Sequence, residues 1–136
     1  YLPWANGLHT LIARRIALGL APVVITIHSF TPVFHGRPRA VEFGVIHDAD
    51  ASLAVAIRDA AARLTRLNAQ LNAPYSAADD VTHTLRVHAT PYGLPNAMLE
   101  IRNDLIRGEA ADAMAETLAP VLNMGLTEIQ KQAKAS

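Results

Sequence analysis

The sequence predicts an α/β fold of three layers, α/β/α, built around a largely parallel or mixed sheet. Apolar runs at 23–28, 41–47 and 96–102 alternate with segments of helical periodicity. Such alternation is typical of α/β proteins, in which helices cover the faces of a central sheet. The chain has 136 residues, of which 51% are hydrophobic. This length and composition predict one domain, residues 1–136, with a buried core.

The first half of the chain is predicted to start with a helix over residues 4–18. Its apolar stripe consists of Leu8, Leu11, Ile12 and Leu18. Gly19 is a suitable helix stop, and a strand is expected over 23–28. The segment 31–39 contains two prolines and a glycine and is predicted to be a loop. A second strand is predicted over 41–47, because its apolar side chains alternate.

A long helix is predicted next, over about residues 51–67, with Asp48 or Asp50 as its cap. Its apolar stripe consists of Leu53, Ile57, Ala60, Leu64 and Leu67. A short strand is expected within 67–71, followed by a loop over 72–76. The strand and helix periods therefore continue to alternate through the middle of the chain.

The last third is predicted to contain a helix, a strand and a final helix. Asp79 or Asp80 is expected to cap a helix that ends near His88, and the strand 96–102 follows. The alanine-rich segment from Glu109 onward is expected to be helical. Within it, Pro120 and Gly125 are expected to kink or break the helix, since proline cannot donate the backbone hydrogen bond.

Polar side chains stand where two apolar strands end. The first strand ends in His28, and the apolar start of the strand 96–102 leads into Glu100 and Arg102. Alternation places Glu100 and Arg102 on one face of the strand and Ile101 on the other. Ligand sites of α/β proteins lie just beyond the carboxyl ends of their strands. We therefore expect the two strand ends to converge on one active site.

The composition excludes several classes of function. The 12 basic and 12 acidic residues give a formal net charge of zero, so no basic field favours nucleic acid or an anionic membrane. No apolar run approaches the roughly 20 residues of a membrane span, and no signal peptide is recognised. The chain has no cysteine, so disulfides are excluded and a metal ion would need His, Asp or Glu ligands. These features fit a cytoplasmic protein.

Two strings in the sequence are similar to motifs of a known family. They are His28-Ser29-Phe30-Thr31-Pro32 and Glu100-Ile101-Arg102-Asn103-Asp104-Leu105-Ile106. Shorter matches lie between them at Gly44-Val45, Asn72 with Pro74-Tyr75-Ser76, His88-Ala89 and Gly93-Leu94-Pro95. On these residues the chain resembles the N-formylglutamate amidohydrolase family over about residues 3–122.

The resemblance implies a zinc-exopeptidase-like fold and a zinc-dependent enzyme. Members of the family hydrolyse N-formyl-L-glutamate to formate and glutamate in histidine catabolism. By this resemblance His28 would be a ligand of Zn2+, and Glu100 would be the general base. Arg102 would help to bind a substrate carboxylate. The remaining residues implied to line the substrate pocket are Asn72, Tyr75 and His88.

The chemistry of these residue types agrees with amide hydrolysis. A metal ion can lower the pKa of water to about 7, and a carboxylate can accept a proton from that water. A zinc site without cysteine is built from histidine and carboxylate ligands with an open position. The planar fork of an arginine matches a substrate carboxylate.

The chain departs from the family pattern in two respects. Members of the family are roughly twice as long, and their other two metal ligands come from an earlier segment. We therefore expect the chain to be the C-terminal portion of a longer catalytic domain. The arginine that precedes Gly-Leu-Pro in the family is Tyr92 here, and the acidic residues around Asn72 are replaced by Leu71 and Ala73. The substrate can thus be another N-acyl amino acid.

A second function agrees with the same residues. In this alternative the chain is a non-catalytic or truncated α/β module that binds a small carboxylate through Arg102 and Asn72.

Two single residues also have alternative roles. Arg102 can be a structural ion-pair partner of Asp104 or Glu100, and His47 at the end of the second strand is a substitute metal ligand. A truncated face would expose apolar surface, so a homo-oligomer or another association is left open.

Overall fold

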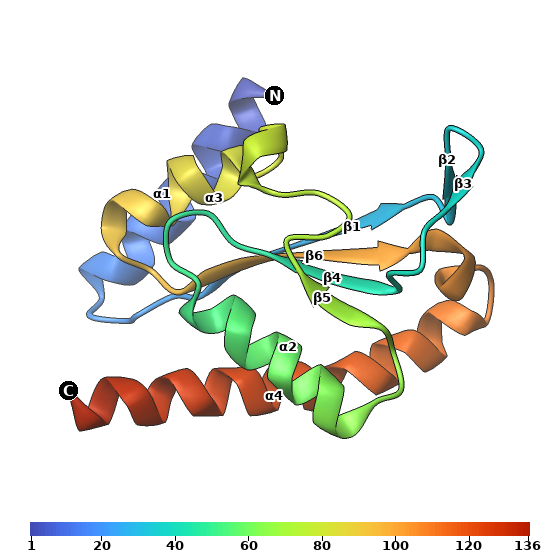
Figure 1. Ribbon diagram of the computed structural model, residues 1–136. Helices are drawn as coiled ribbons and strands as arrows, with labels where there is room; N and C mark the ends of the chain where they lie inside the picture. The colour runs from blue at the N-terminus through green and yellow to red at the C-terminus, as the bar shows by residue number, and fades with distance from the viewer.

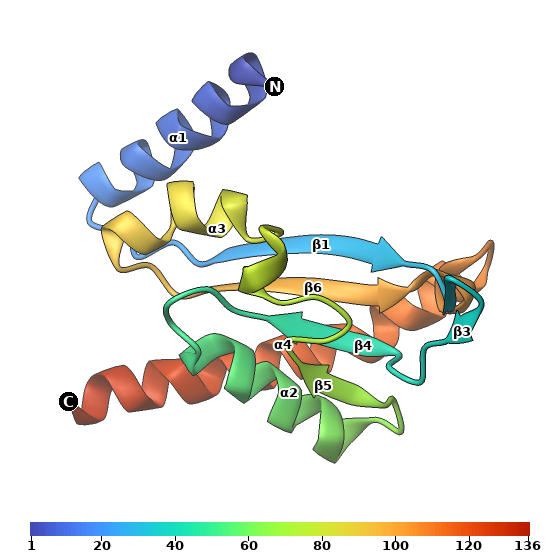
Figure 2. The ribbon, with the colours of Figure 1, turned by 45° about the horizontal axis from the view of Figure 1, so that its top comes forward.

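The computed structural model describes residues 1–136 and has three layers (Figures 1 and 2). Its central sheet has the strand order β1 (Val24–Phe30), β6 (Asn96–Arg102), β4 (Phe43–Ile46) and β5 (Ala69–Leu71). β1 runs parallel to β6 and β4 runs parallel to β5, whereas β4 and β6 are antiparallel. The sheet is therefore mixed, and the predicted α/β/α class is confirmed.

Helices cover both faces of this sheet. In Figure 1, α2 (Ser52–Leu64) and α4 (Ala110–Ala135) lie below the sheet, while α1 (Leu2–Ala17) and α3 (His83–His88) lie above its left part. Short 3-10 helices connect the elements at Ala77–Asp79, Thr90–Tyr92 and Asn103–Ile106. None of the helices combines the length and hydrophobicity that a membrane span requires.

Two apolar clusters, one on each face of the sheet, form the core. Leu99 and Ile101 of β6 pack with Leu53 in the cluster that faces α2 and α4. Met98 belongs to the other cluster, with Ile12 of α1 and Leu85 of α3. Because both faces are covered, the middle of β6 is apolar on both sides, from Ala97 to Leu99. Alternation along β6 then places Glu100 on the same face as Met98, away from α2 and α4.

The last helix is present as predicted, but it is not broken at Pro120 or Gly125. α4 is a single helix of 26 residues, although Pro120 lies inside it. Leu118 and Val121, on either side of Pro120, are buried in the core cluster, and this packing outweighs the hydrogen bond that proline cannot donate. Gly125 permits a close approach to α2, because a Cβ atom there would lie 2.8 Å from Cγ1 of Ile57. Tertiary contact thus keeps the helix whole.

We expect Gly125→Ala to lower the free energy of unfolding by about 1–3 kcal/mol, because the added methyl group overpacks the α2–α4 contact. Gly7→Ala in α1 is the matched control, since nothing lies within 4 Å of a Cβ atom placed there. The control should gain up to about 1 kcal/mol from helix propensity. Urea unfolding of both variants measures the difference, and the same sign for both would contradict this packing.

The predicted loop 31–39 contains a small hairpin instead. β2 (Val33–Phe34) pairs with β3 (Arg37–Pro38) in antiparallel fashion. His35 and Gly36 both have positive φ angles at its turn. Strands of two residues are too short to show alternation, so the sequence pattern could not reveal them.

One other local prediction was also wrong. Asp80 does not cap α3, because it adopts the left-handed conformation, and the preceding Asp79 bonds back to Ser76 in a capping box. The apolar stripe of α1 is only partly covered, because Ile12 is its one buried residue. Trp4 of α1 is 58% exposed, and Ile27 of β1 is 66% exposed. α1 therefore has a less complete apolar contact than its sequence periodicity indicates.

Candidate active site

His28 and Glu100 lie side by side on neighbouring strands. β1 and β6 are parallel, and their register pairs His28 with Glu100. Partners in register project to the same face of a sheet, so both side chains lie on the face opposite to α2 and α4. His28 is exposed and Glu100 is only 3% exposed. The structure thus brings together the imidazole and the carboxylate that the two strand ends predicted.

The carboxylate of Glu100 is buried without full compensation. Its Oε2 atom has no hydrogen-bond partner. Burial raises the pKa of Glu100 to about 7, although the positive charge of Arg39 partly opposes this shift. A carboxylate with such a pKa exists in both protonation states near neutral pH. It can accept and return a proton during a reaction, which is what a general base requires.

A loop crosses the sheet directly beside Glu100. Gly44 of β4 is the register partner of Glu100 on the antiparallel side. A Cβ atom at Gly44 would overlap the carbonyl oxygen of Ala73 and lie 3.2 Å from Cβ of Glu100. Only glycine lets the Ala73 backbone approach the sheet this closely. Gly44 therefore explains how the loop containing Asn72 and Tyr75 covers the site.

The side chain of Asn72 holds this loop to β4 through His47. Its Oδ1 atom accepts a hydrogen bond from the backbone N–H of His47 at 3.3 Å, and its Nδ2 atom lies 2.9 Å from Nε2 of His47. Nδ1 of His47 lies 2.9 Å from the carbonyl oxygen of Asp48. Because a carbonyl only accepts, Nδ1 donates and Nε2 accepts from Asn72. Both nitrogens of His47 are thus engaged within the fold.

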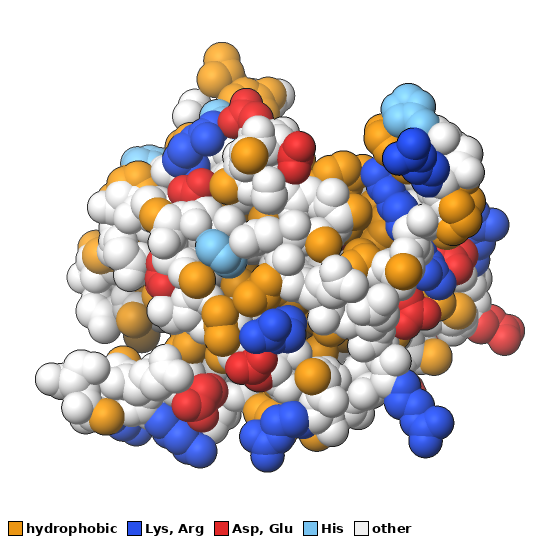
Figure 3. Space-filling view, viewed as in Figure 1, with side chains coloured by type: hydrophobic (Ala, Val, Ile, Leu, Met, Phe, Trp, Pro, Cys, Tyr) orange, Lys and Arg blue, Asp and Glu red, His pale blue; other side chains and the backbone are white.

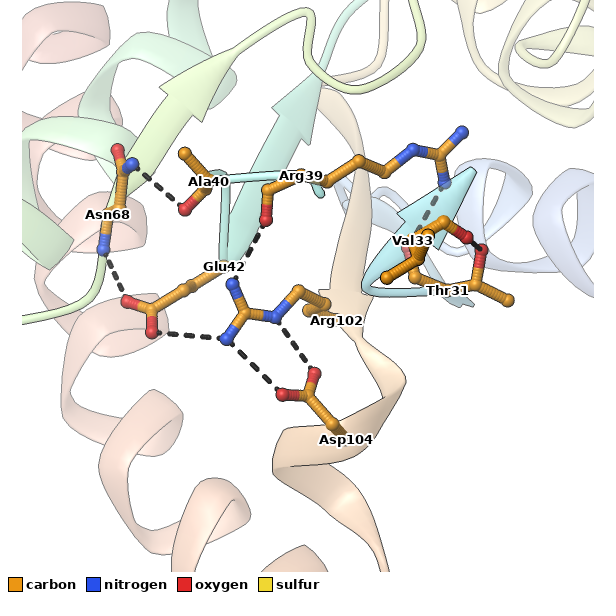
Figure 4. Close-up of polar contacts among 8 residues, drawn as sticks. All are labelled: Thr31, Val33, Arg39, Ala40, Glu42, Asn68, Arg102 and Asp104. Atoms are coloured by element: carbon orange, nitrogen blue, oxygen red, sulfur yellow. Dashed lines mark hydrogen bonds and ion pairs between the residues drawn. The ribbon is translucent and has the colours of Figure 1, made fainter. Parts of the chain in front are cut away.

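Arg102 is occupied by structural partners (Figure 4). Its Nε and Nη2 atoms donate to the carboxylate of Asp104 at 2.8 and 3.2 Å. Nη1 donates to the carbonyl oxygen of Arg39 at 3.1 Å, and Nη2 lies 3.5 Å from Oε1 of Glu42. The hydrogen bond from Arg102 also lowers the pKa of Asp104. The geometry matches the structural alternative for Arg102, with Asp104 as the partner.

His88 lies apart from Glu100. Its side chain is 3% exposed, and its ring centroid lies 6.4 Å from the rings of both Trp4 and His9 in α1. Neither ring nitrogen has a hydrogen-bond partner, and burial lowers the pKa of His88. α1 and α3 cover the start of β1 and β6, on the left of Figure 1, whereas Glu100 is near the carboxyl end of β6. His88 is packed between helices.

The sequence placed Arg39 only in a loop, whereas the structure places it among three aromatic rings. Its Cζ atom is 4.4 Å from the ring centroid of Phe34, 5.2 Å from that of Tyr75 and 5.6 Å from that of Phe30. Two guanidinium nitrogens donate to the hydroxyl of Tyr75, each at 3.3 Å. These rings come from three separate segments, so no spacing in the sequence indicates the cluster.

The residues of this chain do not by themselves form a complete metal site. No group of three or more His, Asp or Glu side chains is arranged to hold a metal ion. Beside Glu100, the sheet offers one imidazole, that of His28. Of the zinc ligands that a complete site needs, these residues therefore supply one, His28.

Two comparisons with known proteins found matches. The model of the N-formylglutamate amidohydrolase family matches residues 1–107. The crystal structure of a gene product from Agrobacterium tumefaciens superposes with a TM-score of 0.92 and is 47% identical in sequence. The match covers 96% of this chain and 52% of that one, so this chain spans about half the length of the similar protein. No curated protein matches the chain. The matched family model includes both strand ends of the site, and the chain belongs to the N-formylglutamate amidohydrolase family.

Proposed function

We propose that this chain takes part in hydrolysing the amide bond of an N-formyl or N-acyl amino acid such as N-formyl-L-glutamate. The observation that carries the proposal is the environment of Glu100. Its carboxylate is buried, lacks a hydrogen-bond partner at Oε2 and lies beside the exposed His28. A base with a pKa of about 7 is well matched to proton transfer at neutral pH. Membership in an amidohydrolase family supports this reaction class.

The reaction proposed for Glu100 needs two proton transfers. In its charged form Glu100 accepts a proton from a water molecule, whose oxygen attacks the acyl carbon of the substrate. The C–N bond of the resulting tetrahedral intermediate then breaks, and Glu100 returns the proton to the leaving nitrogen. The products are formate, or another carboxylate, and the free amino acid. Asn72 and Tyr75 would border the substrate, since their loop crosses the sheet beside Glu100.

In this proposal, His28 is the one residue of this chain that would bind a zinc ion. When bound, zinc would supply positive charge that polarises the acyl group. His28 is the one imidazole beside Glu100, and the other ligands are not found as a cluster among these residues. The two proton transfers described above are assigned to Glu100 and not to the metal ion.

The first experiment measures formate release from N-formyl-L-glutamate together with the zinc content of the purified chain. Hydrolysis that a chelator abolishes and zinc restores is the expected result, and His28→Ala should then lower the zinc content. His83→Ala is the matched control, because His83 is an exposed histidine of α3 that takes no part in the proposed site. Absence of hydrolysis in the zinc-supplemented chain would contradict the proposed activity of this chain.

The incomplete metal cluster favours a second candidate, a non-catalytic module that binds a small carboxylate. This candidate predicts no hydrolysis and no stoichiometric zinc. It still predicts that a carboxylate ligand raises the melting temperature, because binding to the folded state stabilises it. Formate release and zinc content distinguish the two candidates, while thermal unfolding with and without N-formyl-L-glutamate tests the ligand binding that the second candidate predicts.

A further inference from the structure

The guanidinium group of Arg39 is positively charged and has only neutral partners. It donates to the carbonyl oxygen of Thr31 at 3.3 Å and to the hydroxyl of Tyr75. None of the ion pairs in the structure includes Arg39. A guanidinium carries five N–H donors, so Arg39 retains capacity for another acceptor. Arg102 differs, because Asp104 and Glu42 already neutralise it.

The surroundings hold Arg39 in place for such an acceptor. Phe30, Phe34 and Tyr75 surround its Cζ atom, and aromatic faces attract a cation while they exclude water. Phe30 is only 3% exposed, whereas Phe34 is 49% exposed. One wall of the cluster is therefore buried and the other opens to solvent. A ligand can reach the half-buried guanidinium without unfolding the loop.

Arg39 also lies on the side of the sheet where Glu100 projects. Phe30, one of its aromatic neighbours, follows His28 by two residues on β1 and therefore shares its face. Tyr75 belongs to the loop that crosses the sheet beside Glu100, and the charge of Arg39 acts on Glu100. Figure 3 shows the surface hollowed between the helices at upper left and the β2–β3 hairpin, with Lys or Arg side chains on the hairpin side.

From these contacts we infer that Arg39 binds the free carboxylate of the substrate while the acyl group lies at Glu100. The ligand class is an N-acyl amino acid with an unmodified carboxylate. A guanidinium binds a carboxylate through two parallel hydrogen bonds, and the aromatic cluster aims the guanidinium. This inference rests on the proposed function, because it names the residue that binds the carboxylate end of the same substrate in the same site.

The test measures binding rather than turnover. Calorimetry is carried out in the Glu100→Gln background, where no probe is hydrolysed, with N-formyl-L-alanine and N-formyl-L-alaninamide as probes. These compounds differ only in a carboxylate against a neutral amide. We expect the acid to bind about 10- to 100-fold more tightly, as for a charge-assisted bidentate contact. Arg39→Gln should abolish this preference, and Arg39→Lys, which keeps the charge without the fork, should retain part of it.

Arg37→Gln is the matched control, because Arg37 is an exposed arginine of the same hairpin. It should keep the preference for the acid, which separates a specific contact from general charge. An unchanged preference in Arg39→Gln, or no binding of either probe, would overturn the inference. Because the readout is binding, the two proposals can fail separately. If the parent chain hydrolyses the substrate but Arg39→Gln keeps the preference for the acid, only the role of Arg39 is refuted. No hydrolysis with a preference that depends on Arg39 refutes only the proposed reaction.

Discussion

Glu100→Gln is expected to lower the rate of formate release by about 1,000-fold, because glutamine cannot accept the proton from the attacking water. The two side chains have nearly the same shape, so the buried position stays filled. Steady-state hydrolysis of N-formyl-L-glutamate measures the effect. Glu116→Gln, on the exposed face of α4, is the matched control and should leave the rate unchanged.

The same variant should be more stable than the parent chain at neutral pH. The pKa of Glu100 is raised from 4.5 to about 7 in the folded state, with burial as the main cause. Between these values the folded state holds a proton that the unfolded chain has lost, so stability falls as the pH rises. Glutamine removes this penalty, which amounts to about 3 kcal/mol at pH 8 and vanishes below about pH 4.5.

Urea unfolding of both metal-free proteins at pH 4.5 and pH 8 tests this sign. A stability difference that grows between the two pH values would show that Glu100 titrates as a buried group. A destabilised Glu100→Gln at pH 8 would mean that the charged carboxylate has a favourable partner. If the rate also stayed at the parent level, Glu100 would not be the general base.

Gly44→Ala is expected to lower the free energy of unfolding by about 3 kcal/mol or more, since the added carbon overlaps the backbone of Ala73. The Ala73 backbone is not the end of a flexible side chain, so the whole loop must move. Displacement would break the contacts of Asn72 with His47 and of Tyr75 with Arg39. We therefore expect the variant to lose hydrolysis along with stability.

Thermal unfolding measures this effect, and a fall of roughly 10 °C in the melting temperature is expected for about 3 kcal/mol in a domain of this size. Gly7→Ala again supplies the same chemical change at an open position. A Gly44→Ala protein with the parent melting temperature would mean that the loop does not cross the sheet at Gly44. If a destabilised Gly44→Ala protein retained hydrolysis, the position of the loop would not be required for the reaction.

Much of the fold could be predicted because its signals are local. The strand 96–102 was placed at the bounds that β6 has, and the alternation of Glu100 and Ile101 between its faces is also as expected. Apolar periodicity reports which face of an element is covered, and this depends on few neighbours. The failure at Pro120 has the opposite origin. There, contacts between α2 and α4 decide whether a helix-breaking residue is tolerated.

The site divides in the same way between sequence and tertiary structure. The sequence by itself determined that an imidazole and a carboxylate end two apolar strands, and its motifs indicated the family. Only the tertiary structure decided that Arg102 is held by Asp104 and that His88 lies between helices, while Arg39 remains without a carboxylate partner. A residue's type and strand position follow from local pattern. Its ion-pair partner depends on which distant segments the fold brings within a few ångströms.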